Sequence, residues 1–111
     1  MALTDLNKWD LVLVDLNSGT DSDNSKIVIG LVISPNAANK HLPTVIIAPV
    51  TTTIRQYPTR LAFVGGGKSL EICFDQMKSV NKSRIAKVFG PLKGEDRGRI
   101  NTLLAYMFSE P

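Results

Sequence analysis

The sequence predicts a small, mainly β domain, a partly open barrel of short strands with one helix near the C-terminus. Three observations support this. Short apolar runs rich in β-branched residues alternate with polar or glycine-containing turns. Apolar residues at helical spacing occur late in the chain. The 111 residues, 43% hydrophobic and 21% charged, are enough for one modest core, so residues 1–111 are expected to form a single domain.

The strands are expected where the apolar runs lie, at residues 9–16, 27–34, 44–50, 59–64, 69–74 and 83–88. The polar segment Asn17–Lys26 between the first two strands is predicted to be a loop, because it has nothing to bury. Gly30 predicts a bend or a close approach of another chain segment. Residues 35–41 are expected to be a plain connection, and 75–81 a second polar cluster. The three glycines at 65–67 predict a hairpin turn.

Gly90-Pro91 and Gly94 are expected to interrupt the strand pattern before a terminal helix. In that helix one apolar stripe is predicted from the i, i+3, i+4 and i+7 spacing of Ile100, Leu103, Leu104 and Met107. Asp96 near its start suits the positive end of the helix dipole.

Composition excludes several classes of protein. With one His and one Cys the chain offers no zinc cluster of standard spacing, and we expect neither a metal nor a cofactor. Cys73 is expected to fill core. The Gly-Lys-Ser at 67–69 fails as a phosphate-binding P-loop, because the required first glycine is Ala62. Without a signal peptide, a spanning segment or a possible disulfide, a cytoplasmic protein is predicted. The net charge of +3 permits a polyanionic partner.

The segment Leu42–Pro58, LPTVIIAPVTTTIRQYP, organises the rest of the chain. A buried strand there ends in three threonines, then the cation Arg55, and so delivers polar groups to its tip. The lone His41 excludes a ribonuclease that uses two histidines. RNA can still be cleaved by attack of its 2′-OH on the adjacent phosphate, if hydroxyls such as that of Thr51 and a cation stabilise the charge. The alternative is that Thr51 simply favours the strand end.

Three segments resemble the MazF/PemK (Kid-like) toxins, which are mRNA interferases: Lys8–Leu16 (KWDLVLVDL), the strand and threonines just described, and Phe74–Val80 (FDQMKSV). The resemblance covers roughly residues 8–107. It implies the SH3-like barrel shared with CcdB gyrase poisons. It also implies a dimeric, growth-inhibiting, metal-independent endoribonuclease that cuts single-stranded RNA, is paired with an acidic antitoxin, and has its first threonine after the strand in the active site.

The chain departs from this family at the second strand. An arginine considered essential for cleavage would align with Val28, and the nearest cation is Lys26. Two residues along a strand preserve the face, so Lys26 is a candidate substitute, with a solvated loop charge as the equal alternative. An arginine found in some relatives aligns with Cys73, whereas Asp75 and Gln76 match the family. Asp75 has an alternative role as a cap of the following turn.

We therefore assign transition-state stabilisation to Thr51 and to Lys26 as the substitute cation, and orientation or proton transfer to Asp75. RNA binding is assigned to Thr52, Thr53, Arg55, Gln76 and Lys78. Arg60 and Lys82 are expected to extend a basic rim, Tyr57 and Phe74 to be available for base stacking, and the loop 17–26 to gate access. Two alternatives stay open. The first is a silent family member that still binds antitoxin. The second is a CcdB-like gyrase poison, although the chain ends in Ser109-Glu110-Pro111 and so lacks the tail of the gyrase poisons.

Overall fold

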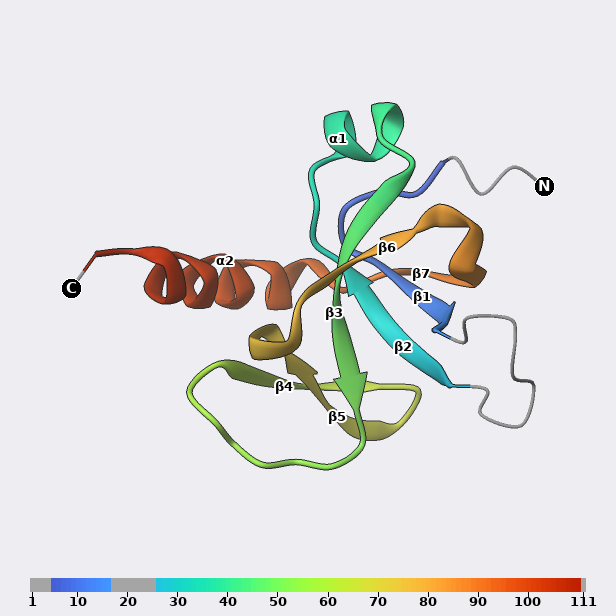
Figure 1. Cartoon of the computed structure of the whole chain (residues 1–111). Helices are drawn as coiled ribbons and strands as arrows, with labels where there is room; N and C mark the ends of the chain where they lie inside the picture. Colours follow the sequence, from blue (N-terminus) through green and yellow to red (C-terminus); the bar gives the residue numbers. More distant parts are fainter. Residues whose placement is uncertain (1–4, 17–25, 111) are drawn as a thin grey trace.

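Seven strands form one antiparallel sheet in the computed structural model, which describes residues 5–16 and 26–110 (Figure 1). The strands are β1 (Asp10–Asp15), β2 (Ile27–Val32), β3 (Thr44–Thr51), β4 (Arg60–Gly65), β5 (Lys68–Cys73), β6 (Lys78–Asn81) and β7 (Ile85–Pro91). The helices are α1 (Asn36–His41) and α2 (Gly94–Phe108), with short 3-10 turns η2 (Phe74–Gln76) and η3 (Lys82–Arg84). The predicted mainly β fold with a C-terminal helix is confirmed.

The order of the sheet is β4-β5-β3-β2-β1-β7, and β6 pairs with β3 beside this path. Because β4 and β7 are its two ends, the barrel is open. Strand β3 has eight residues and pairs with three other strands, β2, β5 and β6. The segment expected to organise the chain is thus the centre of the sheet.

Alternation along the strands divides the core into two clusters. One is built on Leu6, Val12, Val14, Val32, Val45, Ile47, Val80 and Ile85. The other is built on Leu31, Ala48, Leu61, Phe63, Ile72, Phe74, Leu92 and Ile100. In β3 the odd-numbered Val45 and Ile47 belong to the first cluster, whereas Ala48 belongs to the second.

Two glycine predictions are confirmed. A Cβ on Gly30 would lie 2.8 Å from Cδ1 of Ile47, so only glycine lets β2 and this side chain approach so closely. Gly66 and Gly67 have φ values of 60° and 77°, which a tight hairpin between β4 and β5 requires.

The predicted boundaries are wrong in three places. Residues 36–41 form helix α1 instead of a plain connection, and buried Asn39 anchors it by donating a hydrogen bond to the carbonyl of Ser34 at 3.0 Å. Strand β6 lies within the expected polar cluster; it has one buried side chain, Val80, and so lacks an apolar pattern. Strand β7 begins at Ile85 and continues through Gly90-Pro91, with register shifts against β1.

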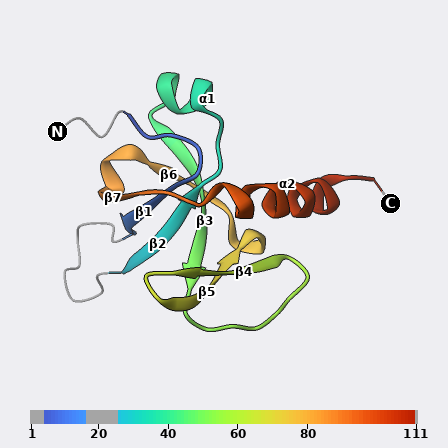
Figure 2. The same ribbon diagram turned by 180° about the vertical axis from the view of Figure 1, so that it is seen from behind.

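Helix α2 carries Glu95 and Asp96 in its first turn, as the dipole favours. The predicted stripe is confirmed: Ile100 is fully buried, and Leu103, Leu104 and Met107 pack partly buried on the second cluster. The helix projects away from the sheet toward the C-terminus (Figures 1 and 2). Near that end Tyr106 and Phe108 are exposed.

Candidate active site at the end of strand β3

Thr51 is the last residue of β3 and is half-buried. Its Oγ1 accepts a hydrogen bond from the backbone N–H of Thr53 at 3.1 Å. In the part of the chain that the structure describes, this leaves the hydroxyl hydrogen available as a donor. Thr52 and Thr53 follow on the surface. Of the three hydroxyls, Thr51 is therefore the one fixed by the sheet.

Glu71 of β5 lies directly opposite Thr51 in the strand register, so both side chains point to the same face. Glu71 is 1% exposed. Its carboxylate accepts the backbone N–H of Arg55 at 3.2 Å on both oxygens and that of Gln56 at 2.9 Å on Oε2. Arg60 Nη1 lies 3.4 Å from Oε1. A buried charge so close to Thr51 was not expected from the sequence.

Arg60 connects Glu71 to Asp75. Its Nε donates to Asp75 Oδ1 at 3.0 Å and its Nη2 to Oδ2 at 3.2 Å, a two-pronged contact. Thr59 Oγ1 donates to the same Oδ1 at 3.1 Å. The guanidinium carbon also lies 4.7 Å from the ring centre of Tyr57. Arg60 pairs with Cys73, the position where the resemblance places an arginine, so a guanidinium reaches this region from the neighbouring strand.

These contacts set the ionisation of the cluster. The hydrogen bond from Arg60 is the main cause that lowers the pKa of Asp75, and Thr59 adds to it. For Glu71, burial alone would raise the pKa, but the N–H groups of Gln56 and Arg55 and the Arg60 guanidinium outweigh it, and the pKa is lowered. The carboxylates in turn raise the pKa of Arg60, led by Asp75. Burial raises the pKa of Cys73 and keeps it a thiol, in keeping with a core role.

Val28 and Lys26 lie at or next to the start of β2, the strand beside β3. Ile29 pairs with Val50, so Val28 and Thr51 are the next residues at the same end of the two strands. Val28 is half-buried against the first core cluster. Lys26 is exposed just before β2, and its carbonyl accepts the N–H of Leu16 at 2.7 Å. Both lie on the β2 side of β3, whereas Asp75 follows β5 on the other side.

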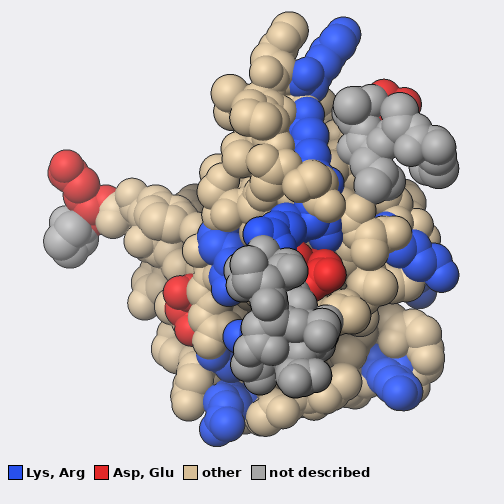
Figure 3. Space-filling view, turned by 45° about the vertical axis from the view of Figure 1, so that its right-hand side comes forward, with Lys and Arg blue, Asp and Glu red and all other residues tan. Residues whose placement is uncertain are grey.

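The predicted RNA-binding residues are exposed: Thr52, Thr53, Arg55, Gln76 and Lys78. Arg60 does not fit the predicted basic rim, because its side chain is 7% exposed and is held by two carboxylates. Phe74 is buried and cannot stack on a base, whereas Tyr57 is exposed. On the face drawn in Figure 3, Lys and Arg are more widespread than Asp and Glu. The predicted gating loop, 17–26, lies outside the described residues except for Lys26.

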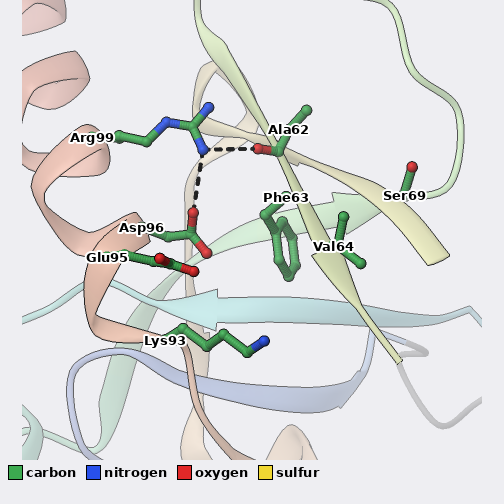
Figure 4. A pocket seen from close by; sticks show the side chains of 8 residues that line it. All are labelled: Ala62, Phe63, Val64, Ser69, Lys93, Glu95, Asp96 and Arg99. Atoms are coloured by element: carbon green, nitrogen blue, oxygen red, sulfur yellow. Dashed lines mark hydrogen bonds and ion pairs between the residues drawn. The ribbon is translucent and has the colours of Figure 1, made fainter. Parts of the chain in front are cut away.

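A cavity of about 320 Å³ lies elsewhere, between the start of α2 and β4 (Figure 4). The guanidinium of Arg99 reaches from α2 toward β4. Its Nη1 lies 3.2 Å from Asp96 Oδ1 and 3.4 Å from the carbonyl oxygen of Ala62. The other residues around it are Phe63, Val64, Ser69, Lys93 and Glu95. Neither this cavity nor the three others found among the described residues includes Thr51, Lys26 or Asp75.

Within residues 5–16 and 26–110, no group of three or more His, Cys, Asp or Glu side chains is placed to hold a metal ion. In the same ranges no helix has the length and apolar character needed to cross a membrane.

Solved structures similar in fold to this chain include endoribonucleases and MazF toxins. An endoribonuclease in complex with its cognate antitoxin from a mycobacterial species is 24% identical, with a TM-score of 0.79 over 96% of this chain and 97% of that one. MazF from Deinococcus radiodurans is 20% identical, with a TM-score of 0.75 over 95% and 97%. MazE-MazF from the same organism is 21% identical, with a TM-score of 0.71 over 91% and 96%. No curated protein sequence matches the chain.

At these sequence identities, the structural similarity establishes only the fold. The family is established by the sequence. The model of the PemK-like, MazF-like toxins of type II toxin–antitoxin systems matches residues 7–108. The chain belongs to this family, as the resemblance of its three segments predicted.

Glu71 is the site residue that the sequence did not reveal. It stands between Leu70 and Ile72 in an alternating strand, a pattern that predicts a solvent-facing side chain. Its carboxylate is bound by the N–H groups of Arg55 and Gln56 and by Arg60, and the sequence carries no local signal of these contacts.

Proposed function

We propose that the chain is the toxin of a type II toxin–antitoxin system and acts as an endoribonuclease on single-stranded RNA in the cytoplasm. The family supports the first part. The observation that carries the second is the half-buried Thr51 at the end of the central strand, with Thr52, Thr53 and Arg55 exposed directly after it. A fixed hydroxyl beside adaptable polar groups is suited to holding one phosphodiester.

The proposed reaction needs no metal. The 2′-oxygen of RNA attacks the adjacent phosphorus, the new P–O2′ bond forms, and the bond from phosphorus to the 5′-oxygen breaks. The 2′-OH proton leaves to solvent or a nearby base, and the departing 5′-oxygen takes up a proton. The products are a 2′,3′-cyclic phosphate and a 5′-hydroxyl. The protein has to position the 2′-oxygen and stabilise the charge on the phosphorane.

In this proposal Thr51 donates its hydroxyl to a phosphorane oxygen, and Lys26 supplies positive charge from the β2 side. The role of Asp75 is narrower. Its lowered pKa makes it a weak base, and Arg60 and Thr59 already bind its oxygens. Orientation of neighbouring groups is therefore favoured over direct proton transfer.

We also propose a homodimer and an acidic antitoxin as partners. Exposed Tyr106 and Phe108 on the projecting part of α2 support a contact with a second copy. Structures of the same fold contain a cognate antitoxin or MazE. An acidic partner is complementary to a chain of net charge +3.

One observation favours a second candidate, a silent member that binds antitoxin without cleaving RNA. Val28 packs against the core at the position of the family's arginine, and valine cannot stabilise an oxyanion. No feature of the described residues favours a gyrase poison in the same way.

The test is incubation of the purified protein with a defined single-stranded transcript, with and without EDTA. Cleavage that is insensitive to chelator, leaves a cyclic phosphate and is lost in Thr51→Ala supports the enzyme. Absence of cleavage together with tight antitoxin binding supports the silent member. Cleavage that requires a divalent cation would contradict the proposed mechanism.

A further inference from the structure

The connection between β3 and β4, residues 52–59, is bound at its centre by one side chain, that of Glu71. Near its ends, Thr53 N–H donates to Thr51 Oγ1 and Arg60 N–H donates to the Tyr57 carbonyl. At Thr59 the carbonyl accepts the N–H of Phe74 at 3.1 Å, and Oγ1 donates to Asp75 Oδ1 at 3.1 Å. At its centre the consecutive N–H groups of Arg55 and Gln56 both point to the carboxylate of Glu71. Gln56 has a φ of 59°, a conformation that a non-glycine residue adopts only when its surroundings impose it.

The cost of burying Glu71 requires an explanation. An ionised carboxylate inside a sheet is strongly unfavourable unless each oxygen is bound by donors. Among the described residues, its donors are two loop N–H groups and the Arg60 guanidinium. Its partners across the sheet are Thr51 and Ala62. The carboxylate therefore makes two kinds of contact, an ion pair with Arg60 and the attachment of this loop.

The attached loop presents two groups suited to single-stranded RNA. The side chain of Arg55 is exposed, and Tyr57 is 46% exposed. The guanidinium of Arg60 lies against the ring of Tyr57 and is itself bound by Glu71 and Asp75. An aromatic ring fixed in this way offers its remaining surface for stacking of a base, and Arg55 offers charge for the backbone.

From this arrangement we infer that Glu71 is a positioning residue: it fixes the loop 52–59 so that Arg55 and Tyr57 bind single-stranded RNA beside the phosphodiester held at Thr51. The inference rests on the proposed ribonuclease function. It adds that two parts of the RNA are bound separately. Thr51 binds the reacting phosphate, and the loop attached to Glu71 binds the neighbouring nucleotides.

The decisive variant is Glu71→Gln, which keeps size and shape but removes the charge and one acceptor. We expect KM for a transcript, and Kd for a short fluorescent RNA with a 2′-deoxy cut site, to rise about tenfold, the scale of losing one stacked base. We expect kcat to stay within about twofold, because Thr51 is untouched. Loss of folding alone would lower the active fraction, and hence the apparent kcat, without raising KM.

A matched control is Asp10→Asn, the same change at another buried carboxylate, which accepts the N–H of Asn7 at 3.0 Å on β1. It is expected to leave KM unchanged. A double-mutant cycle gives a sharper test. If Glu71 acts through the loop, Tyr57→Ala costs much less in KM when Glu71→Gln is already present. Full additivity would contradict the inference.

Two measurements do not depend on activity. In the wild type, the amides of Arg55 and Gln56 are expected to exchange with solvent at least about tenfold more slowly than the neighbouring amide of Ile54. Trypsin is expected to cut the bond after Arg55 at least about tenfold faster in Glu71→Gln than in the wild type or Asp10→Asn. Fast amide exchange in the wild type would overturn the attachment even if the variant failed to fold.

The outcomes separate the two proposals. A wild type that neither cleaves nor binds RNA overturns both the ribonuclease and the role of the loop in RNA binding. A wild type that cleaves RNA, with Glu71→Gln unchanged in KM and in trypsin cleavage, overturns only the role of Glu71.

Discussion

Val28→Arg is the most informative single substitution, because it places a guanidinium beside Thr51 on the adjacent strand. The pairing of Ile29 with Val50 brings residue 28 to the same end of the sheet as Thr51. Opposite residues of an antiparallel pair share a face. An arginine here would therefore project toward the proposed phosphate, with its fork of donors replacing an apolar side chain.

Two magnitudes can be worked out. Val28 is half-buried, so its replacement forfeits about half the value of burying a valine, or about 1 kcal/mol of unfolding free energy, partly recovered by the aliphatic stem of arginine. For a domain of this size that lowers Tm by about 4 °C. Against this, one well-placed donor to a developing oxyanion is worth about 10²-fold in kcat. We therefore expect kcat to rise by at least about tenfold at a small cost in stability.

The assay is single-turnover cleavage of a defined transcript, with thermal unfolding followed in parallel. Val28→Gln controls for the added length without charge, and Val28→Lys tests a point charge against a planar fork. The expected order of rates is Arg above Lys above Gln. A folded Val28→Arg variant with an unchanged rate would show that residue 28 does not face the reacting phosphate. A Gln variant that gains as much would contradict the need for positive charge at this position.

Three further predictions follow from the same structure. Lys26→Ala is expected to lower kcat by at least about tenfold, measured in the same cleavage assay, and full activity would remove this lysine from the site. The folded-state pKa values of Glu71 and Asp75 lie below their ordinary values of 4.5 and 3.8, so the stability they contribute is present above those values and is lost on acidification. Urea unfolding from neutral pH down to about pH 3 should show this fall, and Glu71→Gln should flatten it; an identical slope in the variant would contradict it. Gly30→Ala is expected to cost about 1–3 kcal/mol, measured by urea unfolding, because its Cβ would lie 2.8 Å from Ile47; a neutral result would mean that β2 shifts freely.

The sequence predicted those parts of the fold that depend on local pattern. Strand β1 alternates, the glycines at 66 and 67 form the hairpin, and Ile100 begins a helical stripe, so each could be identified from neighbouring residues alone. Strand β6 could not, because it has one buried side chain and forms through pairing with β3. Helix α1 was missed because its anchor is a buried asparagine bound to the preceding strand, a polar contact without an apolar repeat.

The site residues also separate into those that the local sequence predicts and those that it does not. Thr51 could be identified because the threonine at the strand end and the motif beside it are consecutive in the sequence. Arg60 was expected in a basic rim, since its sequence neighbours give no indication of two carboxylates from β5 and the turn after it. Its charge is neutralised by contacts 11 and 15 residues away along the chain. Contacts of that kind are set by the register of the sheet, which a single sequence leaves open.

The balance of charge around Thr51 indicates on which side of β3 a phosphate is bound. On the β5 side lie the carboxylates of Glu71 and Asp75, the Arg60 guanidinium that is bound to both, and the exposed Arg55 in the connecting loop. A phosphodiester placed directly against the two carboxylates would be repelled at short range, because Arg60 is already bound to them. On the β2 side lie Val28, whose partner on β1 is the uncharged Val14, and Lys26, which is exposed; Asp15 pairs with Ile27 next to them. We therefore expect the reacting phosphate on the β2 side, next to Val28. On that side residue 28 is expected to set the strength of catalysis, while Glu71 and its loop are proposed to act on the neighbouring nucleotides.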